Sequence, residues 1–286
     1  MEENRVKYAV ERFKGELSVL NKTIWEAAEI KYEEYRSEAA VIEVLRKHGF
    51  RLEEQVADIP TAFRAVYGSG RPVIGLLAEY DALDGLSQQA DCLEKKPRPE
   101  TRYGHGCGHN LLGTAVVAAA LDLKDYLEKH PGRGTVIVYG CPAEEGGGGK
   151  CYMVRSGCFD DVDLTLTWHP DNMNYIVPTK LLAIISGKFK FKGMEAHASM
   201  SPDLGRSALD AAELMNVGAN FLREHINGNA RIHYAFLNDG GPYPNVVQSE
   251  AELYYTVRAP KLSQAKEIYD RLVKVAKGAA MMTETT

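Results

Sequence analysis

The chain has 286 residues, 45% hydrophobic and 26% charged, which is ordinary for a globular protein with one large domain or two smaller ones. A formal charge of -5, with no basic cluster, gives no reason to expect a nucleic-acid partner. The N-terminus is polar, and no apolar run approaches the roughly 18 residues of a membrane span. We therefore expect a cytoplasmic protein that is neither secreted nor inserted in a membrane.

The cysteine content also favours a reducing compartment. Five cysteines are an odd number, and they are scattered through a large chain, which is typical of free thiols rather than a disulfide framework. They are Cys92, Cys107, Cys141, Cys151 and Cys158.

The first third of the chain predicts two helices and then two strands. Residues 3–30 carry apolar side chains at helical spacing, and a second helix is expected from Ser37 as N-cap to a stop at Gly49. Residues 61–67 and 72–79 have the composition of strands. The glycine-rich connection at 68–71 is typical of a hairpin, so we expect these strands to pair.

The middle of the chain alternates strands with helices. An exposed loop is expected over residues 84–102, followed by a helix over 111–130 capped by Asn110, a strand over 135–141, a helix over 150–156 and a strand over 162–168. This order predicts an α/β fold with a mostly parallel sheet and helices on both faces. Ligands bind beyond the carboxyl ends of such strands, where Asp81, Glu144, Glu145 and His169 fall.

The pattern changes after residue 180. Strands are expected over 180–192, 231–237 and 246–258, with helices over 205–225 and 262–282. This order is that of a ferredoxin-like (α+β) unit without its last strand. We therefore expect two domains: residues 1–180, and a smaller domain over 181–286.

The stretch from Tyr103 to Asn110 reads Tyr-Gly-His-Gly-Cys-Gly-His-Asn and indicates half of a metal site. Alternating glycines let His105, Cys107 and His109 converge, and thiols and imidazoles suit zinc and similar metals. The pair Glu144-Glu145 and His169 supply further donors at the same sheet edge. Of two adjacent glutamates, one can bind metal while the other acts as general base on water.

Two other readings of these segments explain less. The run Gly146 to Gly149 suggests a phosphate loop, but Lys150 is followed by Cys151 rather than Ser or Thr. Cys107 beside histidines is also a candidate nucleophile. A nucleophile leaves the two glutamates and His169 without a role, whereas a metal site uses all of them.

The segments Gly104-His-Gly-Cys-Gly-His-Asn-Leu-Leu-Gly-Thr114, Tyr139-Gly-Cys-Pro-Ala-Glu-Glu-Gly146 and Leu166-Thr-Trp-His-Pro170 resemble the metal motifs of a known family. This is the co-catalytic metallopeptidase and amidohydrolase family that includes aminoacylases and carboxypeptidases. Three further segments extend the resemblance over essentially the whole chain and towards the branch that hydrolyses p-aminobenzoyl-glutamate. They are Leu86-Ser-Gln-Gln-Ala90, Gly205-Arg-Ser-Ala-Leu-Asp210 and Pro244-Asn-Val-Val-Gln248.

The resemblance implies roles for individual residues. Cys107, His109, Glu145 and His169 would bind two divalent ions, manganese or zinc, and Glu144 would be the general base. His105 would then be a neighbour rather than a ligand.

In the smaller domain, the resemblance implies that His197 polarises the scissile carbonyl and often reaches the site of a neighbouring subunit. Asn245 and Arg258 would lie near the substrate carboxylate. The smaller domain would act as a lid and as a dimerisation surface, in a homodimer or a heteromer.

The chain also departs from the family pattern. Asn110 stands where many relatives have Asp, and the segment that returns to the catalytic sheet with another histidine ligand does not follow residue 286. We therefore expect a C-terminally truncated chain, a shortened form or one part of a split enzyme. The expected activity is metal-dependent cleavage of p-aminobenzoyl-glutamate or a related N-acyl amino acid, in folate catabolism. The alternatives are a dipeptidase or aminoacylase, and a non-catalytic interaction subunit.

Overall fold

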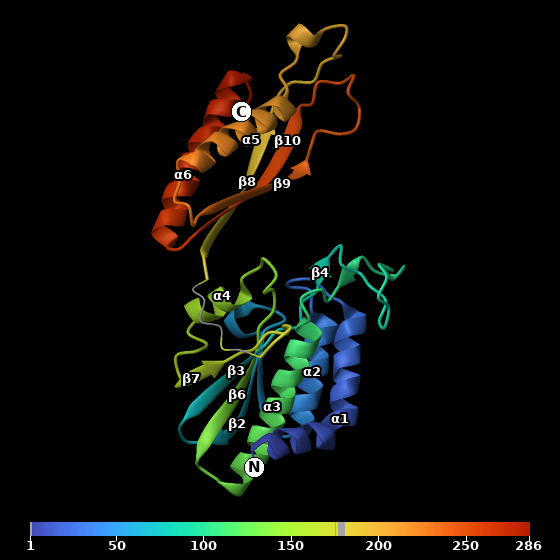
Figure 1. Cartoon of the computed structure of the whole chain (residues 1–286), viewed down its shortest axis with the longest axis vertical. Coiled ribbons are helices and arrows are strands. Elements are labelled where there is room, and N and C mark those ends of the chain that lie inside the picture. Colours follow the sequence, from blue (N-terminus) through green and yellow to red (C-terminus); the bar gives the residue numbers. More distant parts are fainter. Residues whose placement is uncertain (1, 175, 177–180) are drawn as a thin grey trace. The chain divides into compact units, whose positions relative to one another are not determined.

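In the computed structural model, the described residues are 2–174, 176 and 181–286. The chain folds as two compact units, Met1–Asn174 and Tyr175–Thr286, and each has its own buried core (Figure 1). The domain boundary predicted at residue 180, and the strand predicted to begin at Lys180, fall on a stretch outside the described residues.

The first unit is built on a five-stranded sheet. Its strands, in spatial order, are β1 (Arg51–Glu54), β2 (Phe63–Ser69), β6 (Gly134–Gly140), β3 (Val73–Ala78) and β7 (Leu164–Leu166). β6 and β7 both pair with β3 in parallel, whereas β2 runs antiparallel to β6 and to β1. Four strands therefore share one direction, and the largely parallel sheet is confirmed.

The predicted hairpin between β2 and β3 is wrong, because β6 lies between these two strands and pairs with both. β6 is the most deeply buried strand, and a central position lets its side chains be covered on both faces. The connection after β2 packs instead against the turn before β6, where a Cβ on Gly70 would lie 2.3 Å from the Gly132 carbonyl oxygen.

Helices cover both faces of this sheet, as predicted. One face carries α3 (His109–Lys129), and α1 (Glu2–Ala27) and α2 (Tyr35–Lys47) pack beside it. On the other face, Met153 of α4 (Gly149–Arg155) joins a cluster with side chains of β6. Short elements complete the unit: η1 (Val56–Asp58), β4 (Leu83–Asp84) and β5 (Tyr103–Gly104).

Two predicted helix caps are wrong. α2 begins two residues before Ser37, which is buried inside its first turn, because the Glu29 carboxylate accepts the N–H groups of Arg36 and Ser37. α3 begins at His109 after Gly108, which has a positive φ of 76°. Asn110 instead donates from its side-chain amide to Asn21 on α1.

The second unit has the predicted β-α-β-β-α order. Its elements are β8 (Ala183–Lys192), η2 (Pro202–Leu204), α5 (Ala208–Glu224), β9 (Arg231–Asn238), β10 (Glu250–Ala259) and α6 (Leu262–Met282). β10 lies between β8 and β9 and is antiparallel to both. The two helices pack on the sheet through apolar side chains that alternate along β10. Beside β8, Thr286 exchanges two backbone hydrogen bonds with Lys192.

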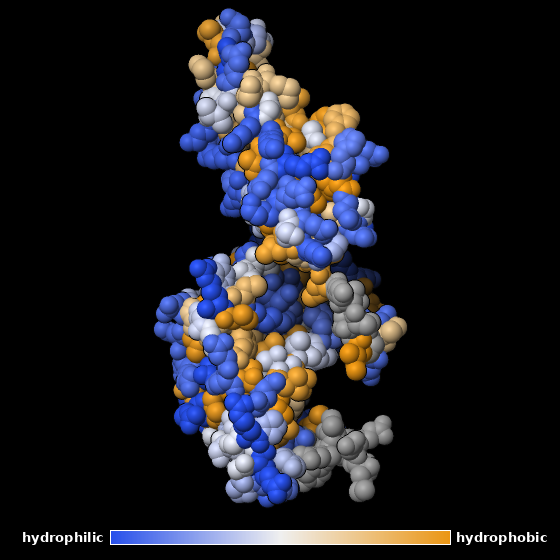
Figure 2. All heavy atoms as spheres, turned by 90° about the vertical axis from the view of Figure 1, so that its left-hand side faces the viewer, coloured by the Kyte–Doolittle hydropathy of each residue, from blue (hydrophilic) through white to orange (hydrophobic). Residues whose placement is uncertain are grey.

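The two sheets leave strand edges at the surface. In the first unit β7 is an edge strand with exposed Leu164 and Leu166, and Figure 2 shows apolar atoms among polar ones on this side of the molecule.

In the part of the chain that the structure describes, every helix is too short or too polar to cross a lipid bilayer.

Candidate metal centre

Three parallel strands deliver the candidate residues to one edge of the sheet. β3 ends at Ala78 and leads to Asp81, β6 ends at Gly140 and leads to Glu144 and Glu145, and β7 is followed by His169. Because parallel strands end at the same edge, residues far apart in sequence become neighbours, as Asp81 and Glu145 do across 64 positions.

The glycines of the 103–110 motif are required by close packing. A Cβ on Gly104 would lie 2.0 Å from the Leu86 carbonyl oxygen, and one on Gly106 would lie 2.5 Å from the Leu86 side chain. Gly108 has a positive φ and lies against the ring of Pro170. The loop that begins at residue 84 therefore presses on the motif, and any larger side chain would displace one of the two segments.

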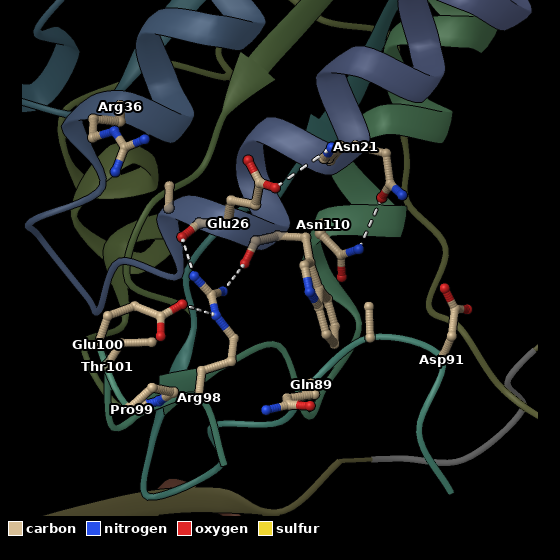
Figure 3. A pocket seen from close by; sticks show the side chains of 14 residues that line it. Asn21, Glu26, Arg36, Gln89, Asp91, Arg98, Pro99, Glu100, Thr101 and Asn110 are labelled. Atoms are coloured by element: carbon tan, nitrogen blue, oxygen red, sulfur yellow. Dashed lines mark hydrogen bonds and ion pairs between the residues drawn. The ribbon is translucent and has the colours of Figure 1, made fainter. Parts of the chain in front are cut away.

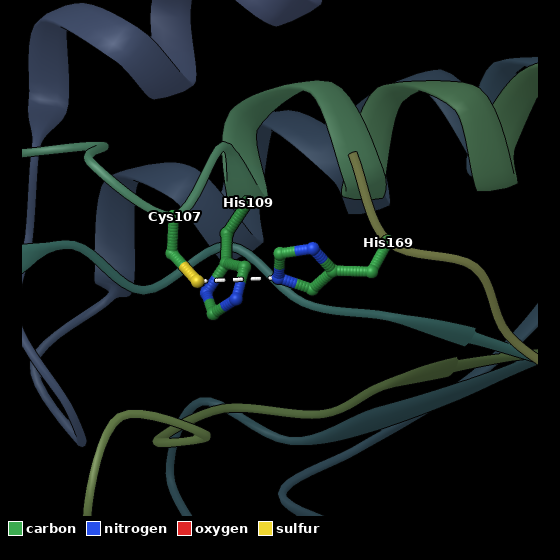
Figure 4. Close-up of side chains that lie close together, drawn as sticks. All are labelled: Cys107, His109 and His169. Carbon is green, nitrogen blue, oxygen red and sulfur yellow. Dashed lines mark hydrogen bonds between the residues drawn. The ribbon is translucent and has the colours of Figure 1, made fainter. Parts of the chain in front are cut away.

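Cys107, His109 and His169 form one group of potential ligands. One donor atom of each lies within 4.8 Å of the others, and the Cys107 sulfur is 3.2 Å from Nε2 of His169 (Figure 4). His109 is fully buried, whereas His169 is exposed, so the group opens to solvent on one side. One thiol and two imidazoles are a donor set suited to zinc.

A second group shares His109 and adds two carboxylates. Nε2 of His109 lies 3.2 Å from Oε2 of Glu79 and 3.8 Å from Oε2 of Glu144. Nδ1 of the same ring donates to Oδ1 of Asp81 at 2.8 Å, so the neutral ring turns the lone pair of Nε2 towards these oxygens. Nε2 is buried without a hydrogen-bond partner, and a cation held there, either a proton or a metal ion, would stabilise the carboxylates that it faces. The residues therefore fit a bound metal ion.

The pKa shifts have the same electrostatic origin. Burial raises the pKa of the Cys107 thiol to about 12, with further increases from a hydrogen bond to Glu145 and the charges of Glu145, Glu144 and Glu79. Burial also raises the pKa of Glu144, as does the charge of Glu79, while Lys150 opposes the rise. Negative charge is concentrated here, and a cation would stabilise the thiolate and the carboxylates.

His109 shows the opposite balance. Burial by itself would lower its pKa, but the hydrogen bond and charge of Asp81, with the charges of Glu79 and Glu145, raise it. The ring therefore lies in a field that attracts positive charge, whether a proton or a metal ion.

Glu145 lies beside Cys107, outside the two groups above. Its backbone N–H donates to Oδ2 of Asp81 at 2.8 Å, while its side-chain Oε1 is buried without a partner. The structure thus brings Cys107, His109, Glu144 and His169 into two groups that share His109, and it places Glu145 beside Cys107.

Sequence reasoning missed three members of the site. The sequence pattern puts Asp81 at the ligand-binding edge of the sheet but does not indicate its role, which is to accept hydrogen bonds from His109 and from the Glu145 backbone. Glu79 and Lys150 were given no role, and they form an ion pair with 2.5 Å between Oε1 and Nζ. The signal available was the spacing Glu79-Tyr80-Asp81 at the end of a buried strand.

His105 is a structural neighbour of the group. It is 6% exposed, its Nε2 lies 2.9 Å from the Ile24 carbonyl oxygen, and its ring stacks on Trp25. Burial lowers its pKa to about 4, so the ring is neutral. His105 thus joins the metal loop to the end of α1.

His197, Asn245 and Arg258 lie in the second unit. His197 forms a β-bridge with Val246, and the Ala198 N–H donates to the Asn245 carbonyl, so these two candidates are neighbours. Arg258 is exposed near the other end of β10, eight positions beyond Glu250 and about 26 Å along the strand. A single copy of this unit therefore does not bring Arg258 to the other two.

A pocket of about 1320 Å³ lies beside the loop of residues 103–110 rather than at the ligand groups. Arg98 crosses it, donating to the carbonyls of Trp25 and Glu26 at the end of α1 (Figure 3). One turn earlier on α1, Asn21 accepts a hydrogen bond from the side-chain amide of Asn110 (Figure 3). The Arg98 contacts fix the 84–102 loop against the end of α1, and the Asn110 contact joins the start of α3 to the same helix.

Known proteins share both the sequence and the fold. The model of "Peptidase family M20/M25/M40" matches residues 75–285. The chain is 54% identical over 263 residues to one of the p-aminobenzoyl-glutamate hydrolase subunits of Escherichia coli K12, covering 92% of this chain and 55% of that protein. It is 33% identical to the Xaa-Arg dipeptidase of Mus musculus, covering 99% of this chain and 63% of that protein. The chain thus spans little more than half the length of these relatives.

A solved structure has the same fold at low sequence identity. It is a Bacillus subtilis protein described as a dinuclear metal-binding peptidase of the M20 family. The TM-score is 0.61 at 18% identity, and the match covers 96% of this chain and 72% of the other.

Proposed function

The chain belongs to peptidase family M20/M25/M40, and we propose that it forms the metal-binding part of an amidohydrolase that cleaves p-aminobenzoyl-glutamate or a related N-acyl amino acid. The observation that carries this proposal is the convergence of Cys107, His109 and His169 with the carboxylates of Glu144 and Glu145 at the ends of parallel strands. The identity of 54% to a p-aminobenzoyl-glutamate hydrolase subunit supports the choice of substrate.

Cys107, His109, Glu145 and His169 are proposed to hold two divalent ions, zinc or manganese. When bound, these ions would supply a Lewis acid that polarises the amide carbonyl and acidifies an attacking water. The mixture of thiol, imidazole and carboxylate donors is compatible with either metal. Asp81 would fix the His109 ring with Nε2 directed at the ion.

Glu144 is the proposed general base. Its side chain is 42% exposed and reaches to 3.8 Å from Nε2 of His109, so it is both accessible and next to the ligands. It would accept a proton from the attacking water and return it to the departing amine nitrogen. Burial and the charge of Glu79 raise its pKa, which makes this carboxylate a stronger base than an exposed glutamate and favours uptake of the proton from water.

His197 is the proposed donor to the carbonyl oxygen. The Ser199 N–H donates to Nδ1 of His197 at 3.3 Å, so the neutral ring carries its proton on Nε2. Such an N–H can stabilise the negative charge that develops on an amide oxygen. Asn245 and Arg258 are proposed to bind the substrate carboxylate. Because they lie far apart in one unit, both could reach the same carboxylate only if they came from two different copies.

The second unit is also the proposed lid and dimerisation surface, in a homodimer or a heteromer. β9 is an edge strand with partly exposed Tyr234 and Phe236, and Val217 and Phe221 are exposed on the adjacent α5. A free strand edge beside apolar side chains suits pairing with another subunit. A cytoplasmic location and a role in folate catabolism belong to the same proposal.

Hydrolysis by the purified protein tests this function. The protein is stripped of metal, reloaded with zinc or manganese, and given p-aminobenzoyl-glutamate, acetylated amino acids and dipeptides in parallel. Metal-dependent release of p-aminobenzoate at the highest kcat/KM is expected. Faster cleavage of Xaa-Arg dipeptides would favour the second candidate, which rests on the 33% identity to a dipeptidase. A chain that binds metal and cleaves none of these amides would instead support a non-catalytic interaction subunit.

A further inference from the structure

The general-base loop, residues 143–150, is held by side chains from the start of the chain. We propose that Glu34 and Tyr32 are positioning residues that fix this loop and thereby aim the Glu144 side chain. The inference rests on the proposed function for the role of Glu144, and on geometry alone for the contacts.

Ala143 directly precedes Glu144 and has an unusual backbone conformation. Its φ of 57° lies in the left-handed region, which is unfavourable for a residue that carries a Cβ. Its N–H donates to Oε1 of Glu34 at 2.8 Å, and Glu34 is fully buried. A buried hydrogen bond to a carboxylate is strong enough to offset this strain.

Glu34 is itself fixed from the opposite side. Its Oε2 accepts the hydroxyl of Thr61 at 2.8 Å, and Thr61 is also fully buried. The carbonyl of Thr61 in turn accepts the hydroxyl of Tyr80, which follows β3. Glu34 therefore connects the general-base loop to the sheet and does not act as a flexible surface carboxylate.

Tyr32 holds the far side of the same loop. Its hydroxyl donates to the Gly147 carbonyl at 2.8 Å, and its ring lies so close that a Cβ on Gly147 would be 2.9 Å from Cε2. Glycines at 146 and 148 have positive φ values, and a glycine-rich segment without such contacts would have many conformations.

The contacts alternate along the loop. Ala143 is bound by Glu34, Glu145 by Asp81 through its N–H, and Gly147 by Tyr32. Glu144 stands between the first two contacts, with its backbone fixed on both sides and its side chain free to reach the ligands. A displacement of about 1 Å at such a group can cost on the order of 100-fold in rate.

The test compares Glu34→Ala with Glu34→Gln in the whole protein. The alanine variant should exchange the amide hydrogens of residues 143–147 at least tenfold faster, lower kcat about 10- to 100-fold and leave KM within about threefold. The Glu34→Gln variant should recover most of the slow amide exchange and most of kcat, because its side-chain oxygen still accepts the Ala143 N–H. Tyr32→Phe, which removes only a hydroxyl, should loosen the loop to a smaller extent and keeps the test open if Glu34→Ala fails to fold.

Glu29→Ala is the matched control. The Glu29 carboxylate binds Arg36 and Ser37 in the first turn of α2, whereas the Glu34 side chain makes no capping bond there. The control should leave exchange in the 143–147 segment unchanged. Equal exchange in Glu29→Ala and Glu34→Ala would overturn the inference, as would faster exchange with an unchanged kcat.

The two failures are distinguishable. If the wild type cleaves no amide, the proposed function fails. The inference can still be decided from amide exchange and manganese affinity, because Glu145, a proposed metal ligand, lies in the same loop. A manganese affinity that is equal in wild type and Glu34→Ala would then overturn it. If the wild type is active and Glu34→Ala equals it, the inference alone fails.

Discussion

Asp81 and His109 form a fully buried carboxylate–imidazole pair, with 2.8 Å between Oδ1 and Nδ1. The second carboxylate oxygen of Asp81 accepts the N–H of Glu145. One side chain thus sets the orientation of a proposed ligand on α3, His109, and the position of a proposed ligand after β6, Glu145. The metal groups depend on this connection, because their members come from different elements.

Asp81→Asn should weaken metal binding about 10- to 100-fold, since the amide would present an N–H where His109 needs an acceptor. Metal affinity can be measured by calorimetric titration of the apoprotein with zinc or manganese. Asp84→Asn is the control, because Asp84 is exposed and pairs with Arg102. Equal affinities in the two variants would contradict a role for Asp81 in orienting His109.

Glu144→Gln should reduce kcat by about 10²- to 10⁴-fold while metal content stays close to that of the wild type. The amide has nearly the same shape as the carboxylate but cannot accept the proton from water. Glu145→Gln should differ by losing metal, because Glu145 is a proposed ligand. Activity and elemental analysis of both variants check the division of roles, and an active Glu144→Gln enzyme would refute it.

Lys150→Met should destabilise the protein by about 3 kcal/mol. This value is at the low end of the range for breaking a buried ion pair, because Lys150 is partly exposed. The change leaves Glu79 charged and 7% exposed beside Glu144. The double variant Glu79→Gln/Lys150→Met should recover most of the loss. Urea unfolding of the single and double variants measures the coupling, and additive losses would show that the pair does not interact.

Gly104→Ala should destabilise the protein by about 1–3 kcal/mol and weaken metal binding, because its Cβ would meet the Leu86 carbonyl. Gly278→Ala is the matched control. Gly278 lies in α6 with open space around its Cβ position, so alanine should stabilise that helix by about 0.5–1 kcal/mol. Thermal unfolding and metal titration check both, and a neutral Gly104→Ala would mean that the two loops can separate.

Glu38→Gln should make stability less dependent on pH. Burial, aided by the charges of Glu54 and Glu29, raises the pKa of Glu38 to about 7. The folded state therefore binds a proton more tightly than the unfolded state, so this stabilisation is complete below about pH 4.5 and is lost as the pH rises through 7. The difference in Tm between the variant and the wild type should therefore be more positive at pH 8 than at pH 5. An equal difference at both values would contradict the shift.

Much of the site could be predicted because its residues follow strand ends. Glu144, Glu145 and His169 each come directly after a β-branched or apolar run, and the parallel direction of those strands puts them at one edge. The glycine-rich motif predicted Cys107 and His109, because these two residues lie close together in the sequence as well as in the structure. In these cases a local pattern carries the spatial information.

The missed features depend on which strands are neighbours. The pairing of Glu79 with Lys150, and of Glu34 with Ala143, joins residues 71 and 109 positions apart. The wrong hairpin has the same cause, because the 68–71 turn gives no sign that β6 lies between β2 and β3. The predicted start of α2 is wrong because the Glu29 carboxylate, seven residues before Arg36, accepts the N–H groups of the first turn, whereas an adjacent residue usually fills this role.

The backbone pairing of Thr286 with Lys192 has a practical consequence for where a tag is placed. The N–H and carbonyl of Thr286 both bond to Lys192, so the residue is already aligned with the free edge of β8. A peptide fused after it would start along that strand instead of pointing into solvent. An affinity tag at this end would compete for the sheet edge and bias any measurement of self-association, so oligomeric state is better measured on a protein tagged elsewhere.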